Sequence, residues 1–369
     1  MQELKRIINY KRIILLLIAV TVNVVFFLYD NKPVMDEDII NKENVAHETY
    51  IKNYHEEVNA IIDNADKLKK YSIFNKAGSF SYANILQTAR DFERVKNVIL
   101  PEDEYKGVQA YTTYYYQYFF TMLVMMFVIY DMFAQRDNGM WSITYSCANG
   151  RIMYAIKQTG VIVVTGAFTH TLIYWSTFIA AMLQRGGVRD LVNPVQTIET
   201  FDKFTYPWSK IKYVTVLYLI SMVCIVALCI TIWGVFVMFR NRVYALVTML
   251  IFAAVEQFIY SHIDIHSVWN GLHYINIINI ININATFSSY RNWGVGTYVF
   301  PVFSVVLFVH IICAGVIGYI AINVSASMKP YKNTTFIKRF TDCVSAGCQK
   351  ILARIPFLFK EIHKFIFTS

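Results

Sequence analysis

The feature that most constrains this 369-residue chain is the bunching of its apolar residues into six long runs. A helix that crosses a membrane needs about 20 mostly apolar residues, and these runs approach or exceed that length. The composition, 56% hydrophobic and 16% charged, lies outside the range of ordinary soluble domains. The sequence therefore predicts six transmembrane helices. The runs are Ile13–Leu28, Tyr118–Phe133, Val161–Leu183, Val214–Phe239, Ala245–Tyr260 and Tyr298–Ile322.

The predicted orientation follows from the basic residues that flank these runs. Lys5, Arg6, Lys11 and Arg12 precede the first run. Secretory signal peptides share that arrangement, but no small-residue cleavage site follows, so we expect an uncleaved first span. Basic residues are denser in the segments that would then be cytoplasmic, which places both termini inside. The net charge of +9 fits basic residues facing membrane lipid better than a nucleic acid, because no nucleic-acid motif is present.

The predicted spans divide the chain into four parts. Residues 1–29 hold an interfacial N-terminus and the first span, and 30–117 form an extracellular helical domain. Residues 118–323 form a five-span bundle with a cytoplasmic loop at 134–157, and 324–369 form a basic amphipathic tail. The predicted fold class is all-α integral membrane: six transmembrane helices, an extracellular helical hairpin domain and amphipathic interfacial helices. No cysteine falls outside, so we expect no extracellular disulfide framework.

Within 30–117, apolar side chains recur at helical spacing in two stretches. Ser79 or Ser81 can cap the second helix, and Pro101 is expected to end it. Each helix has one apolar face, so the two would pack as a hairpin. The favoured role is a spacer that orders the outer mouth; recognition of a substrate or partner is the alternative. The faces are His47, Ile51, Tyr54, Val58, Ile61, Ala65 and Leu68, then Tyr82, Ile85, Ala89, Phe92 and Val95.

Three other segments predict interfacial structure. The Tyr-rich run at 111–118 falls where an aromatic belt is expected. The Asn- and Ile-rich run at 274–284 has an Asn stripe at helical spacing, which favours an interfacial or re-entrant helix over a buried strand. The tail stripe at 337–355 should lie on the inner leaflet, with docking onto a cytoplasmic partner as the alternative. The expected interface anchors are Trp269, Tyr290 and Trp293.

Catalytic signatures are absent from the sequence. It has no phosphate-binding P-loop, no H-E-x-x-H zinc motif and no G-x-S-x-G nucleophile motif. His262, His266 and His273 lie close to Asp264, which leaves a metal site as one interpretation and a satisfied polar loop as the favoured one. We therefore expect no enzyme activity and no cofactor bound by this chain.

Four ionisable residues fall within the predicted spans: Glu256, Asp131, His170 and His310. A charge at the middle of a membrane helix costs roughly 2.5–3.5 kcal/mol on insertion scales, so Glu256 should face protein or water. One interpretation makes Glu256 a pathway or gating residue, and the other makes it an interhelical polar contact. So few scattered polar residues are not typical of a proton-driven carrier.

A polar segment from Arg136 to Lys157 separates the second apolar run from the third. Gly139 can end or bend the helix that leaves the membrane, and 140–149 can form a short surface helix before Arg151 opens the next helix. The pattern resembles the first cytoplasmic loop of ATP-binding cassette (ABC) type-2 exporter permeases, with departures at Met140, Trp141 and Ala148. The matching residues are Arg136, Asp137, Gly139, Tyr145, Ser146, Arg151 and Lys157.

The resemblance extends to the layout of one span, a large outside domain and five more spans. The run Ser81–Thr88 also resembles the outside domains of such permeases from Gram-positive bacteria. The family resemblance implies a bacterial plasma-membrane permease subunit that exports an amphipathic peptide, lipid-like or drug-like substrate. It implies two partners, a separate ABC ATPase subunit that binds ATP and Mg²⁺ and a second permease subunit, identical or related. The short helix after Gly139 would dock on the ATPase.

Two other classes of function stay open on the sequence alone. One is a membrane sensor or assembly scaffold that uses the outside hairpin for binding. The other is a secondary carrier, in which Glu256 would be essential and ATP would not. In both, the segment at 136–157 would be a plain re-entry loop with Arg151 and Lys157 at the level of the lipid headgroups.

Overall fold

The computed structural model describes residues 10–33, 36–71, 74–76, 78–101, 106–137, 150–239, 241–263, 267 and 269–327. Within these residues six helices are long and apolar enough to cross a membrane, one for each predicted span. The chain is thus an all-α, multi-pass membrane protein. The predicted tail lies outside the described residues. The six helices are α2 (Tyr10–Asp30), α6 (Tyr116–Asp137), α8 (Gly150–Arg185), α9 (Lys210–Met238), α10 (Arg242–His262) and α14 (Val302–Ser327).

The predicted start of the sixth span is wrong. Tyr298–Pro301 is a strand, β2, which pairs antiparallel with β1 (Asn292–Val295). Gly296 has φ +62° at the connecting turn, a conformation that favours glycine and allows a tight hairpin. Pro301 fits the last position of an edge strand because it has no N–H to donate. The last span therefore begins at Val302, whose N–H bonds the Arg291 carbonyl at 2.9 Å.

The centre of the bundle is α9, which packs against α6, α8, α10 and α14. Its side chains are apolar around most of the circumference, as expected for a helix surrounded by others. Trp233, Phe236 and Cys229 are fully buried there. By contrast, α10 buries only Ala245 and Met249, so most of its surface faces outward.

A polar clamp holds α2 to the bundle. Asn23 is fully buried in the middle of α2, where its Nδ2 donates to Thr177 Oγ1 on α8 at 2.7 Å. The Tyr114 hydroxyl donates to Asn23 Oδ1 at 3.1 Å. Interhelical hydrogen bonds of this kind satisfy polar groups that lipid cannot.

Replacing Asn23 by leucine is expected to loosen α2 by about 0.6–1.7 kcal/mol, because the side-chain bond between α2 and Thr177 of α8 is lost. The Tyr114 hydroxyl keeps only the backbone carbonyl of residue 23, at 3.2 Å. The measurement is thermal unfolding of the detergent-solubilised protein. Thr21→Val is the matched control: Thr21 is exposed, and its hydroxyl donates only to the Leu17 carbonyl of its own helix. Equal melting temperatures for Asn23→Leu and Thr21→Val would contradict the clamp.

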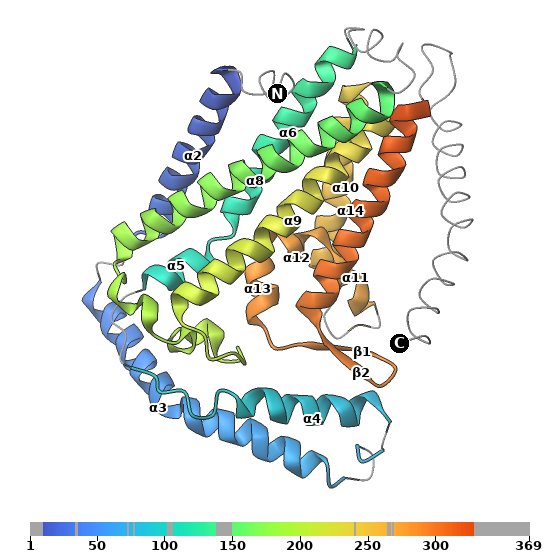
Figure 1. Ribbon diagram of the computed structural model, residues 1–369. Coiled ribbons are helices and arrows are strands. Elements are labelled where there is room, and N and C mark those ends of the chain that lie inside the picture. The colour runs from blue at the N-terminus through green and yellow to red at the C-terminus, as the bar shows by residue number, and fades with distance from the viewer. Residues whose placement is uncertain are drawn as a thin grey trace.

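The bundle has two distinct ends. The start of α2, the end of α6, the α9–α10 connection and the end of α14 share one end, here called the terminal side (Figure 1). Two further helices, α3 (Glu37–Leu68) and α4 (Phe80–Glu93), lie across the opposite end, the hairpin side (Figure 1). Every second connection between spans falls on the same side, as alternate crossing requires.

The predicted hairpin is present, with its core close to the expected positions. Ser79 caps α4 by accepting from the Tyr82 N–H at 3.2 Å. Ile62 is buried where Ile61 was predicted, and Ile61 is only partly covered. The predicted end at Pro101 is wrong, because α4 ends at Glu93. Tight turns follow, which carry Val95 into the core through a bond from its N–H to the Phe92 carbonyl at 3.1 Å.

The Tyr-rich run does not form the expected aromatic belt. Tyr111, Tyr114 and Tyr118 are each at most 2% exposed and pack in the bundle core. The run is broken between α5 (Gly107–Thr113) and α6, so three of its five tyrosines turn inward. Tyr111 meets Tyr174 edge-on at 5.2 Å between ring centroids. This contact joins α5 to α8.

The Asn- and Ile-rich run is helical but broken into short pieces. Asn276 caps α12, because its side chain accepts from the Ile278 N–H at 2.8 Å. Asn282 lies between α12 and α13 and makes no side-chain cap bond. The pieces contact α9, α10 and α14 rather than lying apart on a surface. They are α11 (Asn270–Ile275), α12 (Ile277–Ile281) and α13 (Ile283–Ser288), and the α8–α9 connection holds three 3₁₀ turns, η1 (Arg189–Val192), η2 (Val195–Thr197) and η3 (Glu199–Phe201).

Candidate functional sites at the two ends of the bundle

The terminal-side end of α6 is tied to the end of α9 through Arg136. Its Nη1 donates to the Phe236 carbonyl at 3.0 Å, and its guanidinium lies 4.6 Å from the centroid of the Phe133 ring. Phe236 is in the last turn of α9, where carbonyls lack intrahelical donors and a cation is favourable. Arg136 therefore links the exit of α6 mechanically to α9.

Two more arginines surround the same end of α6. Arg242, at the start of α10, lies 4.5 Å from the Tyr130 ring centroid. Arg12, near the start of α2, donates through Nε to Asp131 Oδ2 at 3.1 Å. The Asp131 side chain is 63% exposed, so Asp131 is an exposed carboxylate paired with Arg12 rather than a buried charge. The end of α6 contacts α2, α9 and α10 through these arginines.

The structure covers the 136–157 motif only at its edges. Gly139, Tyr145 and Ser146 lie outside the described residues, as does the side chain of Asp137, the last residue of α6. Arg151 is in the first turn of α8 and partly buried, and Lys157 is exposed two turns further on. The predicted start of the next helix at Arg151 agrees with α8, which begins at Gly150.

A polar cluster lies deep in the bundle around His170. This residue is 1% exposed, and its Nε2 lies 2.9 Å from Ser221 Oγ on α9. Its ring stacks on Tyr118 of α6 and Tyr218 of α9, at 5.9 and 5.8 Å. Sequence reasoning singled out His170 but missed its partners. A Ser within an apolar run and a Tyr at a span start were the available signals, and both are too common to be selected.

Glu256 supports the short helices beside it. Its Oε2 accepts from the Ile277 N–H at 3.1 Å, and its backbone carbonyl accepts from Asn276 Nδ2 at 2.7 Å. Glu256 is six residues from the end of α10, about 9 Å along the helix axis, so α12 begins below the level of the helix end. This geometry is an interhelical polar contact. His310, on α14, bonds the Val306 carbonyl of its own helix at 2.8 Å.

Replacing Glu256 by leucine is expected to destabilise α12 by about 0.5–2 kcal/mol, the usual cost of losing a side-chain cap. Glu256→Gln keeps an acceptor for the Ile277 N–H and should stay close to the wild type. Hydrogen exchange of amides 270–288 is the measurement, with Gln257→Leu, at an exposed neighbouring position, as control. Equal loss of protection in Glu256→Gln and Glu256→Leu would show that the charge, and not the cap, matters.

The histidines near 262–273 do not gather into a metal site among the residues the structure covers. His273 stacks on Tyr260 at 4.6 Å, and His262 Nδ1 lies 3.0 Å from the Phe258 carbonyl. Asp264 and His266 lie outside that part of the chain. Of the three predicted anchors, Trp269 is exposed, whereas Trp293 and Tyr290 pack against other elements.

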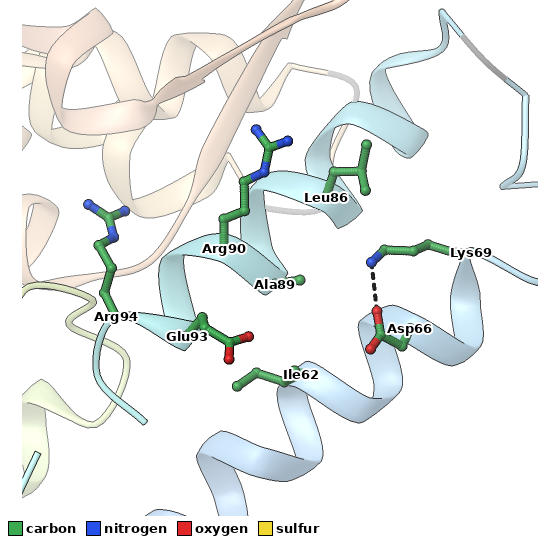
Figure 2. A pocket seen from close by; sticks show the side chains of 8 residues that line it. All are labelled: Ile62, Asp66, Lys69, Leu86, Ala89, Arg90, Glu93 and Arg94. Carbon is green, nitrogen blue, oxygen red and sulfur yellow. Dashed lines mark hydrogen bonds and ion pairs between the residues drawn. The ribbon is translucent and has the colours of Figure 1, made fainter. Parts of the chain in front are cut away.

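On the hairpin side, a groove of about 410 Å³ runs between α3 and α4 (Figure 2). Ile62, Leu86 and Ala89 form its apolar part, and five charged side chains surround them. Lys69 pairs with Asp66 at 2.6 Å, and that contact lowers the pKa of the Asp66 carboxyl. Because cations and carboxylates are interleaved, the groove favours neither sign of ligand. The charged side chains are Asp66, Lys69, Arg90, Glu93 and Arg94.

The hairpin is fixed to the bundle by a network around Asp91, which sequence reasoning missed. Asp91 is 6% exposed and accepts from the Tyr290 hydroxyl at 3.0 Å and from Gln87 Nε2 at 2.9 Å. Burial raises the pKa of Tyr290 to about 12, so its hydroxyl remains a donor at neutral pH. Asn292 Nδ2 donates to Asn84 Oδ1 at 2.9 Å. This network joins α4 to the segment that leads into α14.

Comparison of the chain with protein-family models, curated proteins and solved structures gives no match. Its function is therefore inferred from the six-span fold, from the contacts at the two ends of the bundle and from the resemblance of the 136–157 segment.

Proposed function

We propose that this chain is the membrane-spanning permease subunit of an ATP-driven ABC exporter, acting with a separate ATPase subunit. The observation that carries the proposal is the position of two helix ends. The end of α6 and the start of α8, which border residues 138–149, both lie on the terminal side, opposite the hairpin (Figure 1). An ATPase docked there would contact one side of the membrane while the hairpin faced the other.

The contacts of Arg136 supply a route for force. A displacement of the segment after α6 acts on Arg136, which holds the last turn of α9 through the Phe236 carbonyl. The helix α9 in turn packs against four other spans. A small shift at the terminal side is thereby passed to the whole bundle, as rocking of packed helices requires. The cargo expected from the resemblance is an amphipathic peptide, lipid-like or drug-like molecule.

The orientation proposed with this function places both termini and the 136–157 segment in the cytoplasm of a bacterial cell. The hairpin would then be extracellular. A second permease subunit, identical or related, would complete the transport pathway. The sparsely packed α10 offers a large apolar surface for lipid or for that subunit.

The proposal is tested by affinity purification of the tagged chain from its native membrane, followed by identification of bound proteins. We expect an ABC ATPase to co-purify, and the purified complex to hydrolyse ATP. A pull-down without an ATPase would contradict the proposal and leave the sensor or scaffold interpretation. Transport that survives ATP depletion but is abolished by Glu256→Gln would instead favour the secondary carrier.

A further inference from the structure

The α3 end of the hairpin is attached to the bundle around His47. The Tyr50 hydroxyl, one turn along α3, donates to the Gln196 carbonyl in η2 at 2.7 Å. His47 Nδ1 lies 3.9 Å from Glu199 Oε1 in η3. These contacts join α3 to the connection between α8 and α9. They are distinct from the Asp91 network, which joins α4 to the segment before α14.

His47 is placed so that its two ring nitrogens differ. Nδ1 faces the Glu199 carboxylate, whereas Nε2 is buried and has no hydrogen-bond partner among the residues described here. Neutral imidazole tolerates this arrangement when its proton is on Nδ1, because the unprotonated Nε2 then has no hydrogen to donate. Imidazolium carries N–H groups at both positions, so protonation would bury a charged donor without an acceptor.

The charges facing His47 come from three other elements. Glu199 in η3 attracts imidazolium, whereas Lys106 before α5 and Lys210 at the start of α9 repel it. On its own helix, Glu43 is paired with Lys106. Burial is the largest influence and lowers the pKa of His47 below the usual 6.5. The single carboxylate therefore does not compensate for burial and two cations.

We propose that the α3 end of the hairpin is a pH-sensitive latch, closed while His47 is neutral and released from the α8–α9 connection when His47 is protonated. The α4 end stays docked through Asp91 and Tyr290. Release would break the contacts of α3 with η2 and η3 at this end of the bundle. The latch is independent of the proposed transport function, because it follows from contacts within the chain.

The direction of the pH dependence follows from linkage. The released state has histidine with its usual pKa of about 6.5, and the docked state has a lower one, so the released state binds more protons in acid. The contribution of His47 to docking is therefore fully present above about pH 6.5 and is lost as the pH falls through the lower, docked value.

The test is hydrogen exchange of the full chain in lipid nanodiscs at about pH 7.5 and about pH 5.5, the range over which histidine titrates. Rates are corrected for the intrinsic pH dependence of amide exchange. We expect a several-fold loss of protection at the lower pH in residues 44–54 and 195–203. Residues 84–93 of α4 should keep their protection and serve as the internal reference.

Two variants make the result specific. His47→Gln, which cannot be protonated, should remove the pH response. His55→Gln should retain it, because His55 lies on the same helix but is exposed. Its ring lies 3.1 Å from the Lys96 carbonyl and 5.7 Å from the Tyr54 ring, rather than against η2 or η3. The latch is overturned if the wild type shows no pH response, if His47→Gln responds like the wild type, or if α4 loses protection together with α3.

Discussion

Arg136→Glu is expected to lower transport-coupled ATP hydrolysis by at least about tenfold, which corresponds to ~1.4 kcal/mol. The wild-type guanidinium donates to the Phe236 carbonyl at the end of α9, where the helix carries partial negative charge. A carboxylate there has no hydrogen to donate and is repelled by the same carbonyls. A hydrogen bond to a charged group contributes about 1.5–3 kcal/mol, so the link between α6 and α9 should be lost.

Two control variants distinguish loss of this hydrogen bond from a change in net charge. Arg136→Lys keeps the cation and should retain most of the activity. Lys11→Glu changes the charge by the same amount on the terminal side, but Lys11 is exposed on α2, so activity should be unaffected. ATP hydrolysis is measured with and without substrate in the complex that co-purifies from membranes. If Arg136→Glu couples as well as Lys11→Glu, the route through α9 is wrong, even where the ATPase partner is confirmed.

The spans were predictable because lipid leaves little choice. A run of about 20 apolar residues can satisfy its backbone in a membrane only as a helix, so composition alone located all six. The start of the sixth span was wrongly predicted at Tyr298. The aromatic and β-branched residues there are compatible with either a strand or a membrane span. The turn at Gly296 decides between them, and a hydropathy count does not weigh a single glycine.

The polar contacts were far less predictable. Glu256 and His170 stood out because ionisable residues are rare in spans, but their partners are a backbone N–H and a serine that the sequence places far away. The Tyr-rich run was expected at the lipid surface because tyrosine suits both environments. Its inward turn depends on the break after α5, a feature of tertiary packing. Asp91 was overlooked because an Asp on an outside helix is usually solvated.

The second large effect is expected from Gly294→Leu. Gly294, in β1, lies against the ring of Phe80, the first residue of α4, and a Cβ at this position would overlap that ring. Overpacking of this kind costs about 1–3 kcal/mol, because the ring cannot move without leaving the strand. The Asn84–Asn292 and Asp91–Tyr290 hydrogen bonds lie along the same contact, so separation of α4 from β1 should weaken them as well.

The measurement for Gly294→Leu is limited proteolysis of the full chain in detergent, read by the rate of cleavage within residues 69–101. We expect faster cleavage there and unchanged protection of α8 and α9. The small core of the hairpin, around Tyr54, Val58 and Phe92, is separate from the core that α8 and α9 share. Gly296→Asn is the matched control. It enlarges a side chain in the same β-hairpin, but the site is open, and Asn tolerates its positive φ. If both variants are cleaved alike, close packing of Phe80 on Gly294 does not hold the hairpin to the bundle, and the Asp91 network alone must do so.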